Sequence, residues 1–250
     1  MTIEKIIRAS QDKVMMLQQH KKAYFYQTIL GGMYIGFGML LLLTLGSQLQ
    51  GEPYVKLVQG ATFGIALTLV LMAGADLFTG NPLLMTITYQ TKHITKIQAV
   101  QATISSYIGN AIGAVIIGSL FYWSGLMHEA FQEGVIQTAT LKITPSFTAL
   151  LVRGILCNML VCIAVWANFK MQTEVGRILI IFCCILPFIT MGFEHSIANM
   201  TLFSVVAQLP QHNITLLNML SNLLPVTIGN IIGGVFIALA YLSTVVTQAK

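Results

Sequence analysis

Long apolar segments account for most of this 250-residue chain, and they constrain its fold more than any other feature. A helix needs about 20 predominantly apolar residues to cross the hydrocarbon core of a membrane. Hydrophobic residues make up 56% of the chain and charged residues only 8%, whereas soluble domains carry about 25% charged residues. The sequence therefore predicts an all-α membrane protein. Its six expected transmembrane segments are 24–47, 58–88, 104–126, 147–169, 178–208 and 214–247.

The second and fifth segments are too long and too interrupted to be plain spans. The second contains "GADLFTGNP" at 74–82, and the fifth contains "GFEHSIAN" at 192–199. Glycine, proline and polar residues at membrane depth favour unwound backbone, which is tolerated only where protein or a water-filled cavity surrounds it. The sequence therefore predicts that these two helices are broken.

The two interrupted segments repeat one pattern. Each has an acidic residue two positions after a glycine and an asparagine five positions further on, and Glu194 follows Asp76 by 118 residues. A second match links "GNAIGAV" at 109–115 to "GNIIGGV" at 229–235, which lies 120 residues later. The similar offsets indicate an internal duplication. The Gly-Asn-x-x-Gly stretches are typical of close helix packing with a polar contact.

This repeat sets the expected domain organisation, a single transmembrane domain over 1–250. The first repeat is 24–126 and the second is 147–247, with three spans in each. An odd number of spans makes the two repeats inverted, and in such folds the functional site lies near the midplane, where broken helices meet. The N-terminal stretch, 1–23, is expected to form a cytoplasmic amphipathic helix on the membrane surface.

The distribution of lysine and arginine predicts the orientation. Ten of these residues fall on the side that holds both chain ends, and only Lys56 and Lys142 fall on the other. Positive residues favour the cytoplasmic side, so both termini are expected there, in a multi-pass protein of the cell (inner or plasma) membrane. The net charge of +5 comes from basic residues in short loops and at the ends, which set this orientation. It does not suggest a nucleic-acid partner. Arg153 is left over, within the fourth span.

The residues with possible chemistry are few. All four cysteines lie inside apolar runs without metal-ligand spacing, so no metal site is expected. Glu194 and His195 stand together at the break of the fifth segment. A charged group at bilayer depth costs about 2.5–3.5 kcal/mol on insertion scales, and such groups usually face the protein interior and mark a pathway.

The motifs "AGADLFTGN", "GFEHSIANM" and "CNMLVCIAVW", with the paired Gly-Asn-x-x-Gly stretches, resemble the formate/nitrite transporter family over about 24–245. "GATFGIALTLV" and "GFEHSIANMTLF" look closest to its nitrite branch, the NirC-type transporters. The resemblance implies an aquaporin-like protomer in the membrane lipid, a homopentamer with one pore per protomer, and small monovalent anions as substrates. It implies no cofactor and no enzymatic reaction.

The resemblance also implies roles for individual residues. His195 matches the central pore histidine, with Thr79 opposite it, and Lys142 matches a lysine of the outer vestibule. Asn199 and Asn158 match two asparagines of a polar network around the histidine. The hydrophobic constrictions and the pore wall match Phe63, Leu67, Leu77, Phe78 and Phe188. Asp76 and Glu194 are expected to be structural, accepting hydrogen bonds from loop N–H groups. The resemblance gives no role to Arg153.

Proton transfer offers a mechanism for an anion at such a constriction. A bare anion crosses apolar surroundings at great cost, but its conjugate acid is neutral. An unperturbed histidine titrates near pH 6.5. Burial disfavours protonated His195 and an approaching anion favours it, so transfer of the proton to the anion removes both charges. Thr79 can donate a hydrogen bond to the substrate.

Other interpretations remain open. Within the class, a formate channel is the alternative to a nitrite transporter. From another class, a neutral-solute pore for water or glycerol is possible, although His195 and Lys142 suit an anion and the paired Asn-Pro-Ala signature of aquaporins is absent. A membrane enzyme would need a nucleophile with a base, or metal ligands, and one intramembrane histidine is too little. A neutral pore would pass glycerol into vesicles.

Overall fold

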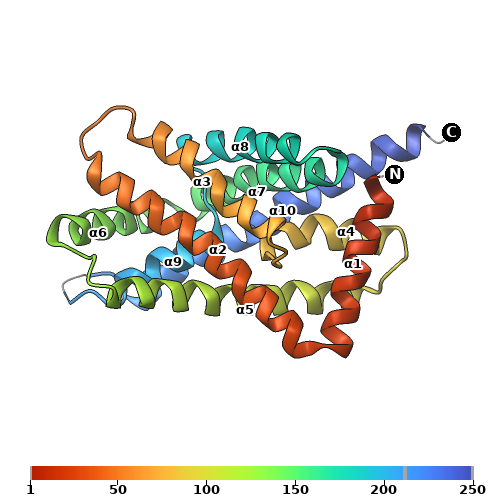
Figure 1. Cartoon of the computed structure of the whole chain (residues 1–250), viewed down its shortest axis with the longest axis horizontal. Coiled ribbons are helices and arrows are strands. Elements are labelled where there is room, and N and C mark those ends of the chain that lie inside the picture. The colour runs from red at the N-terminus through yellow and green to blue at the C-terminus, as the bar shows by residue number, and fades with distance from the viewer. Residues whose placement is uncertain (1, 211–212, 249–250) are drawn as a thin grey trace.

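The computed structural model describes residues 2–210 and 213–248, and every element within them is a helix. The elements in chain order are α1 Thr2–Gln19, α2 Lys21–Gln48, α3 Val55–Met72, the 3₁₀ turn η1 Phe78–Gly80, α4 Asn81–Gln90, α5 Lys96–Trp123, α6 Glu129–Ile143, α7 Phe147–Lys170, α8 Glu174–Thr190, α9 Ser196–Val206 and α10 Leu216–Gln248. Long helices run side by side, with both chain ends at one end of the bundle and α6 at the other (Figure 1).

The long helices confirm the prediction of an all-α membrane protein. Among the described residues, five helices are long and apolar enough to cross a membrane: α2, α3, α5, α7 and α10. Helix α8 has 17 residues, at the short end of the range for a spanning helix, so a sixth span stays a prediction. Helix α2 packs on α5 and α7 packs on α10, while α3 packs on α8 between them.

Both predicted breaks are present. Helix α3 ends at Met72 and α4 begins at Asn81, while α8 ends at Thr190 and α9 begins at Ser196. Gly74 and Gly192 follow the two long helices with φ of 79° and 75°, a left-handed conformation in which glycine pays no Cβ penalty. After each glycine the chain turns back toward the middle of the bundle, where the short helix begins (Figure 1).

Two elements near the ends differ from expectation. Helix α1 forms, but it lies across one end of the bundle (Figure 1) and buries Ile6, Ile7 and Val14 against protein rather than a membrane surface. The ends of α2 and α4 offer that apolar face a partner, and the Ser10 hydroxyl also reaches the Leu84 carbonyl at 3.3 Å. Helix α6, which no sequence signal predicted, packs through Phe131 and its neighbours one and two turns on.

The Gly-Asn-x-x-Gly stretches are packing sites, as predicted. A Cβ on Gly113 of α5 would lie 2.0 Å from the carbonyl oxygen of Ile29, and one on Gly233 of α10 would lie 2.3 Å from that of Ile155. Neither neighbour can yield, because each is main chain. The glycines therefore set how closely α5 approaches α2 and α10 approaches α7.

Gly113→Ala is expected to lower the thermal stability of the purified protein in detergent, because α2 and α5 would have to separate. Overpacking of this kind costs about 1–3 kcal/mol. Gly134→Ala, within α6, is the matched control: a Cβ there meets only Ser47, at 4.0 Å, and alanine favours the helix by up to about 1 kcal/mol. Melting temperatures followed by tryptophan fluorescence test this, and equal melting of the two variants would contradict it.

Candidate functional site

The two break loops bring a histidine and a threonine together. Nε2 of His195 lies 3.1 Å from the Thr79 hydroxyl, and both side chains are buried. His195 is also the N-cap of α9, where its Nδ1 accepts a hydrogen bond from the N–H of Ala198 at 3.3 Å. A neutral imidazole with an accepting Nδ1 carries its proton on Nε2. That N–H then donates to Thr79, whose own hydroxyl proton is free for another acceptor.

The imidazole is the polar edge of an otherwise apolar chamber of about 10 Å³, close to the smallest space that holds a water molecule. The rings of Phe63 and Phe188 meet edge to face at 5.8 Å, and the Phe188 ring lies 6.3 Å from the His195 ring. The residues that line the chamber are Ile35, Phe63, Leu67, Leu77, Val161, Ile185, Phe188 and His195. An unsolvated anion would be costly here.

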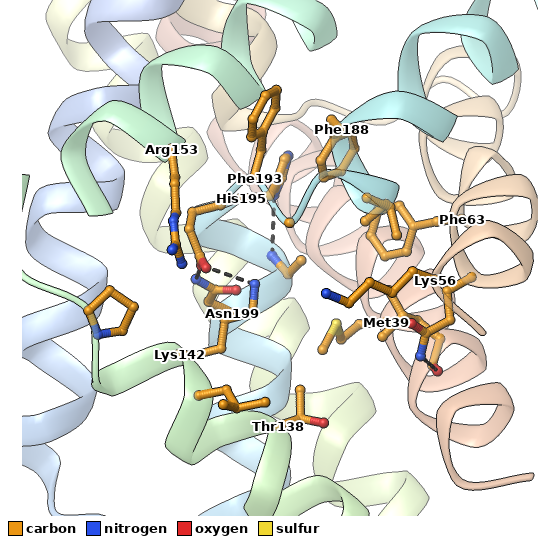
Figure 2. A pocket seen from close by; sticks show the side chains of 18 of the residues that line it. Met39, Lys56, Phe63, Thr138, Lys142, Arg153, Phe188, Phe193, His195 and Asn199 are labelled. Carbon is orange, nitrogen blue, oxygen red and sulfur yellow. Dashed lines mark hydrogen bonds and ion pairs between the residues drawn. The ribbon is translucent and has the colours of Figure 1, made fainter. Parts of the chain in front are cut away.

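A larger cavity of about 580 Å³ leads to the same histidine from the end of the bundle that holds α6, and we call it the α6-side vestibule. Its basic side chains are Lys56, Lys142 and Arg153, and its acidic side chain is Glu194. Figure 2 shows Lys56 reaching in from one side, with Lys142 and Arg153 on the other. The vestibule therefore carries more positive than negative charge.

A buried hydrogen-bonded chain fixes one wall of the vestibule. The Lys142 ammonium lies 3.1 Å from Oε2 of Glu194, which is 2% exposed. The Asn199 amide donates to the same oxygen at 2.7 Å and to the Asn222 side chain at 2.9 Å. Asn222 in turn donates to the Lys142 carbonyl at 2.7 Å. This chain ties α6, α9 and α10 together around one carboxylate.

The other break has the same arrangement. Asp76 pairs with Lys13 of α1 at 3.2 Å and accepts hydrogen bonds from Asn81 and Ser106, both at 3.0 Å. The sequence predicted that loop N–H groups donate to both carboxylates, and this prediction is wrong. Side chains donate to Asp76 and to Glu194 instead. Loop N–H groups are instead satisfied by the repeated asparagines: Phe78 donates to Asn110 at 2.8 Å. Each carboxylate forms an ion pair with a lysine, Asp76 with Lys13 and Glu194 with Lys142, and the sequence analysis did not predict either pair.

The same asparagine position serves in the second half. Ser196 N–H donates to Asn230 at 3.0 Å, and the Asn230 amide donates to the carbonyls of Glu194 and Gly154 at 3.0 and 2.8 Å. Both asparagines thus anchor a break loop to a long helix. The sequence signal that could have identified them was the repeat itself, which places one beside each break.

Comparisons with known proteins agree with this architecture. The family model for the formate/nitrite transporter matches residues 1–243. The chain belongs to the formate/nitrite transporter family. The nitrite transporter NirC of Salmonella typhimurium is 38% identical over 223 residues, covering 87% of this chain and 81% of that protein.

Solved structures of the family are similar in fold. A channel described as an FNT family ion channel superposes with a TM-score of 0.91 at 35% identity, covering 97% of this chain and 98% of the other. A pentameric formate channel with formate bound gives a TM-score of 0.79 at 25% identity, covering 92% and 99%. The fold and family are those of membrane channels and transporters rather than enzymes.

Not every residue suggested by resemblance to the formate/nitrite transporter family contacts the histidine. Asn158 donates to the Asn230 carbonyl, and Asn199 bonds to Glu194 and Asn222. The His195 ring bonds to Thr79 and to the Ala198 N–H, and Asn199 reaches His195 only through its main-chain N–H, so the expected side-chain network around the ring is replaced by one that holds the loops. Phe78 packs on Tyr107 at 4.8 Å and does not line the chamber.

Proposed function

We propose that this family member is a channel or proton-coupled transporter for a small monovalent anion, with nitrite as the first candidate. One observation carries the proposal: the His195–Thr79 contact borders an apolar chamber at the end of a vestibule with excess positive charge. A pore for neutral solutes gains nothing from the cations. The likeness to NirC, a nitrite transporter, supports nitrite as the first candidate ahead of formate.

In the proposed cycle, an anion from the α6-side vestibule meets protonated His195. The Nε2–H bond breaks as an O–H bond forms on the anion, which leaves neutral histidine and a neutral acid. Protonated histidine carries a proton on each ring nitrogen, so its Nδ1 can no longer accept from Ala198. Loss of the Nε2 proton leaves the remaining proton on Nδ1, so the cap from Ala198 forms again only after the ring returns to the tautomer that carries its proton on Nε2. The Thr79 hydroxyl stabilises the substrate oxygen, and the neutral acid passes the Leu77 side of the chamber.

The proposal includes an assembly and an orientation. The similar formate channel is pentameric, and we propose a homopentamer in the cell membrane, with the pore within each protomer. Lys56 and Lys142 both line the vestibule at the end of the bundle away from the chain termini. Because most other basic residues lie toward the termini, the positive-inside rule makes the vestibule the outer mouth and both termini cytoplasmic.

Anion uptake by proteoliposomes tests the proposal. We expect nitrite to enter faster than formate, and glycerol not to enter above the rate of protein-free vesicles. Formate equal to or faster than nitrite would move the protein to the alternative, a formate channel, which the similar pentameric structure keeps open. Glycerol entry without anion entry, in vesicles whose protein has the correct melting temperature, would overturn the anion proposal.

A further inference from the structure

The inverted repeat relates several residues beside the α6-side vestibule to residues at the opposite break. The Glu194 N–H donates to the Arg153 carbonyl at 3.3 Å, and the Asp76 N–H donates to the Gln27 carbonyl at 3.2 Å. The next residues agree, because Asn230 binds the Gly154 carbonyl and Asn110 binds that of Thr28. Arg153 therefore occupies the place that neutral Gln27 occupies in the first half.

The Arg153 side chain has no bonding partner among the residues that the structure describes. Its guanidinium forms no hydrogen bond or ion pair with any residue in the described ranges 2–210 and 213–248, although it lines the α6-side vestibule. The one carboxylate of this cavity, Glu194, is held by Lys142 and Asn199 instead. In Figure 2 the guanidinium ends beside Asn199, with Lys142 close to it and Lys56 across the cavity. A cation is thus aimed at the path to His195 with no protein anion to neutralise it.

Arginine and lysine recognise different features of an anion. A guanidinium presents parallel N–H groups that fit two oxygens of one planar group, whereas an ammonium attracts any anion as a point charge. Nitrite and formate both carry two oxygens on one atom. The Lys142 and Lys56 ammonium groups attract any anion. The Arg153 guanidinium can in addition distinguish a planar anion with two oxygens from anions of other shapes.

We propose that Arg153 is a specificity-determining residue, which binds a planar two-oxygen anion in the α6-side vestibule before it reaches His195. This inference rests on the proposed function and adds to it a site at one mouth only, because the counterpart residue is Gln27. The two mouths are therefore unequal: the KM for entry from the α6 side is lower than the KM from the other side. The gradient still sets the direction of net flux.

Arg153→Lys keeps the positive charge but removes the parallel N–H groups of the guanidinium, which we call the fork. Arg153→Gln introduces the residue type found at the counterpart position, Gln27. For nitrite entry from the α6 side, we expect both to raise KM about tenfold, the scale of hydrogen bonds to a charged group, with maximal flux unchanged. Arg153→Gln should also reduce the difference in KM between vesicles of the two orientations. Lys56→Gln is the matched control, a cation lost from the same cavity, and should raise KM only at low ionic strength.

If Arg153→Lys has the same KM as the wild type, the inference is overturned whatever the effect of Arg153→Gln, because a positive charge alone would then be enough to bind the anion. A fall in maximal flux at constant KM would also overturn it. Arg153→Lys retains the aliphatic stem and the charge, so this variant tests the fork even if Arg153→Gln does not fold. Absence of nitrite uptake by the wild type would instead overturn the proposed function.

Discussion

His195→Asn is expected to reduce nitrite flux at pH 6 by about 100-fold, the lower end of what a positioned proton donor contributes. The wild-type flux should rise as pH falls, because only a protonated ring can neutralise the anion and a lower pH increases the share of protonated rings. Asparagine has no proton to give, so the remaining flux should lose this pH dependence. Initial rates in proteoliposomes, corrected for protein-free vesicles, measure both.

Asparagine is chosen because it preserves the fold. It is a preferred N-cap residue and can accept from the Ala198 N–H in place of the imidazole Nδ1. Thr79→Val and Thr79→Ser form a second matched pair, in which only serine keeps the hydroxyl that contacts His195. Valine should slow the flux and serine should not. Unchanged pH dependence in a correctly folded His195→Asn variant would exclude the proton-transfer mechanism.

The second large effect is expected from Lys142→Met, which leaves Glu194 buried without its cation. Breaking a buried ion pair costs about 3–5 kcal/mol, and because the Lys142 side chain is 22% exposed we expect the lower end. The melting temperature should fall, and nitrite KM should rise about tenfold, since an unpaired carboxylate now faces the path of the anion. Thermal unfolding and flux on the same preparation test the two effects.

A double variant separates stability from attraction. Lys142→Met with Glu194→Gln leaves no charge at this pair, and the glutamine retains an oxygen for Asn199. We expect the melting temperature to return most of the way to wild type, while KM stays above it because a cation is still missing. If the double variant melts as low as Lys142→Met alone, the ion pair is not the source of the lost stability.

Much of this fold is readable from the sequence, because membrane helices carry strong local signals. The apolar segments predicted the helices, and glycine and polar residues inside two of those segments predicted both breaks. Side-chain pairing was not readable: Lys13 and Lys142 lie 63 and 52 residues from the acids that they bind, and no periodicity connects them. Only the positions of α1 and α6 in the folded chain bring each lysine to its acid.

Helices α1 and α6, which are not among the candidate membrane spans, were the least predictable elements. In α6, Phe131, Val135 and Ala139 share one face, but polar neighbours dilute that pattern in a stretch between strong apolar segments. In α1 the amphipathic pattern was evident, yet the same face suits lipid or protein, and only the packing of Ile6 decides between them. The proposed role of Arg153 depends on the structural repeat, because sequence alone does not align Arg153 with Gln27.

The duplication is unequal at one decisive place. Leu77 precedes His195 by 118 residues, the spacing of the two acids, and both line the central chamber. An ionisable side chain is thus present at this position in only one half of the repeat, and His195 is the chamber's only ionisable lining residue among those that the structure describes. On the proposed mechanism the stoichiometry is one proton for each anion. Transport is then electroneutral, driven by the gradients of substrate and pH and indifferent to the membrane potential.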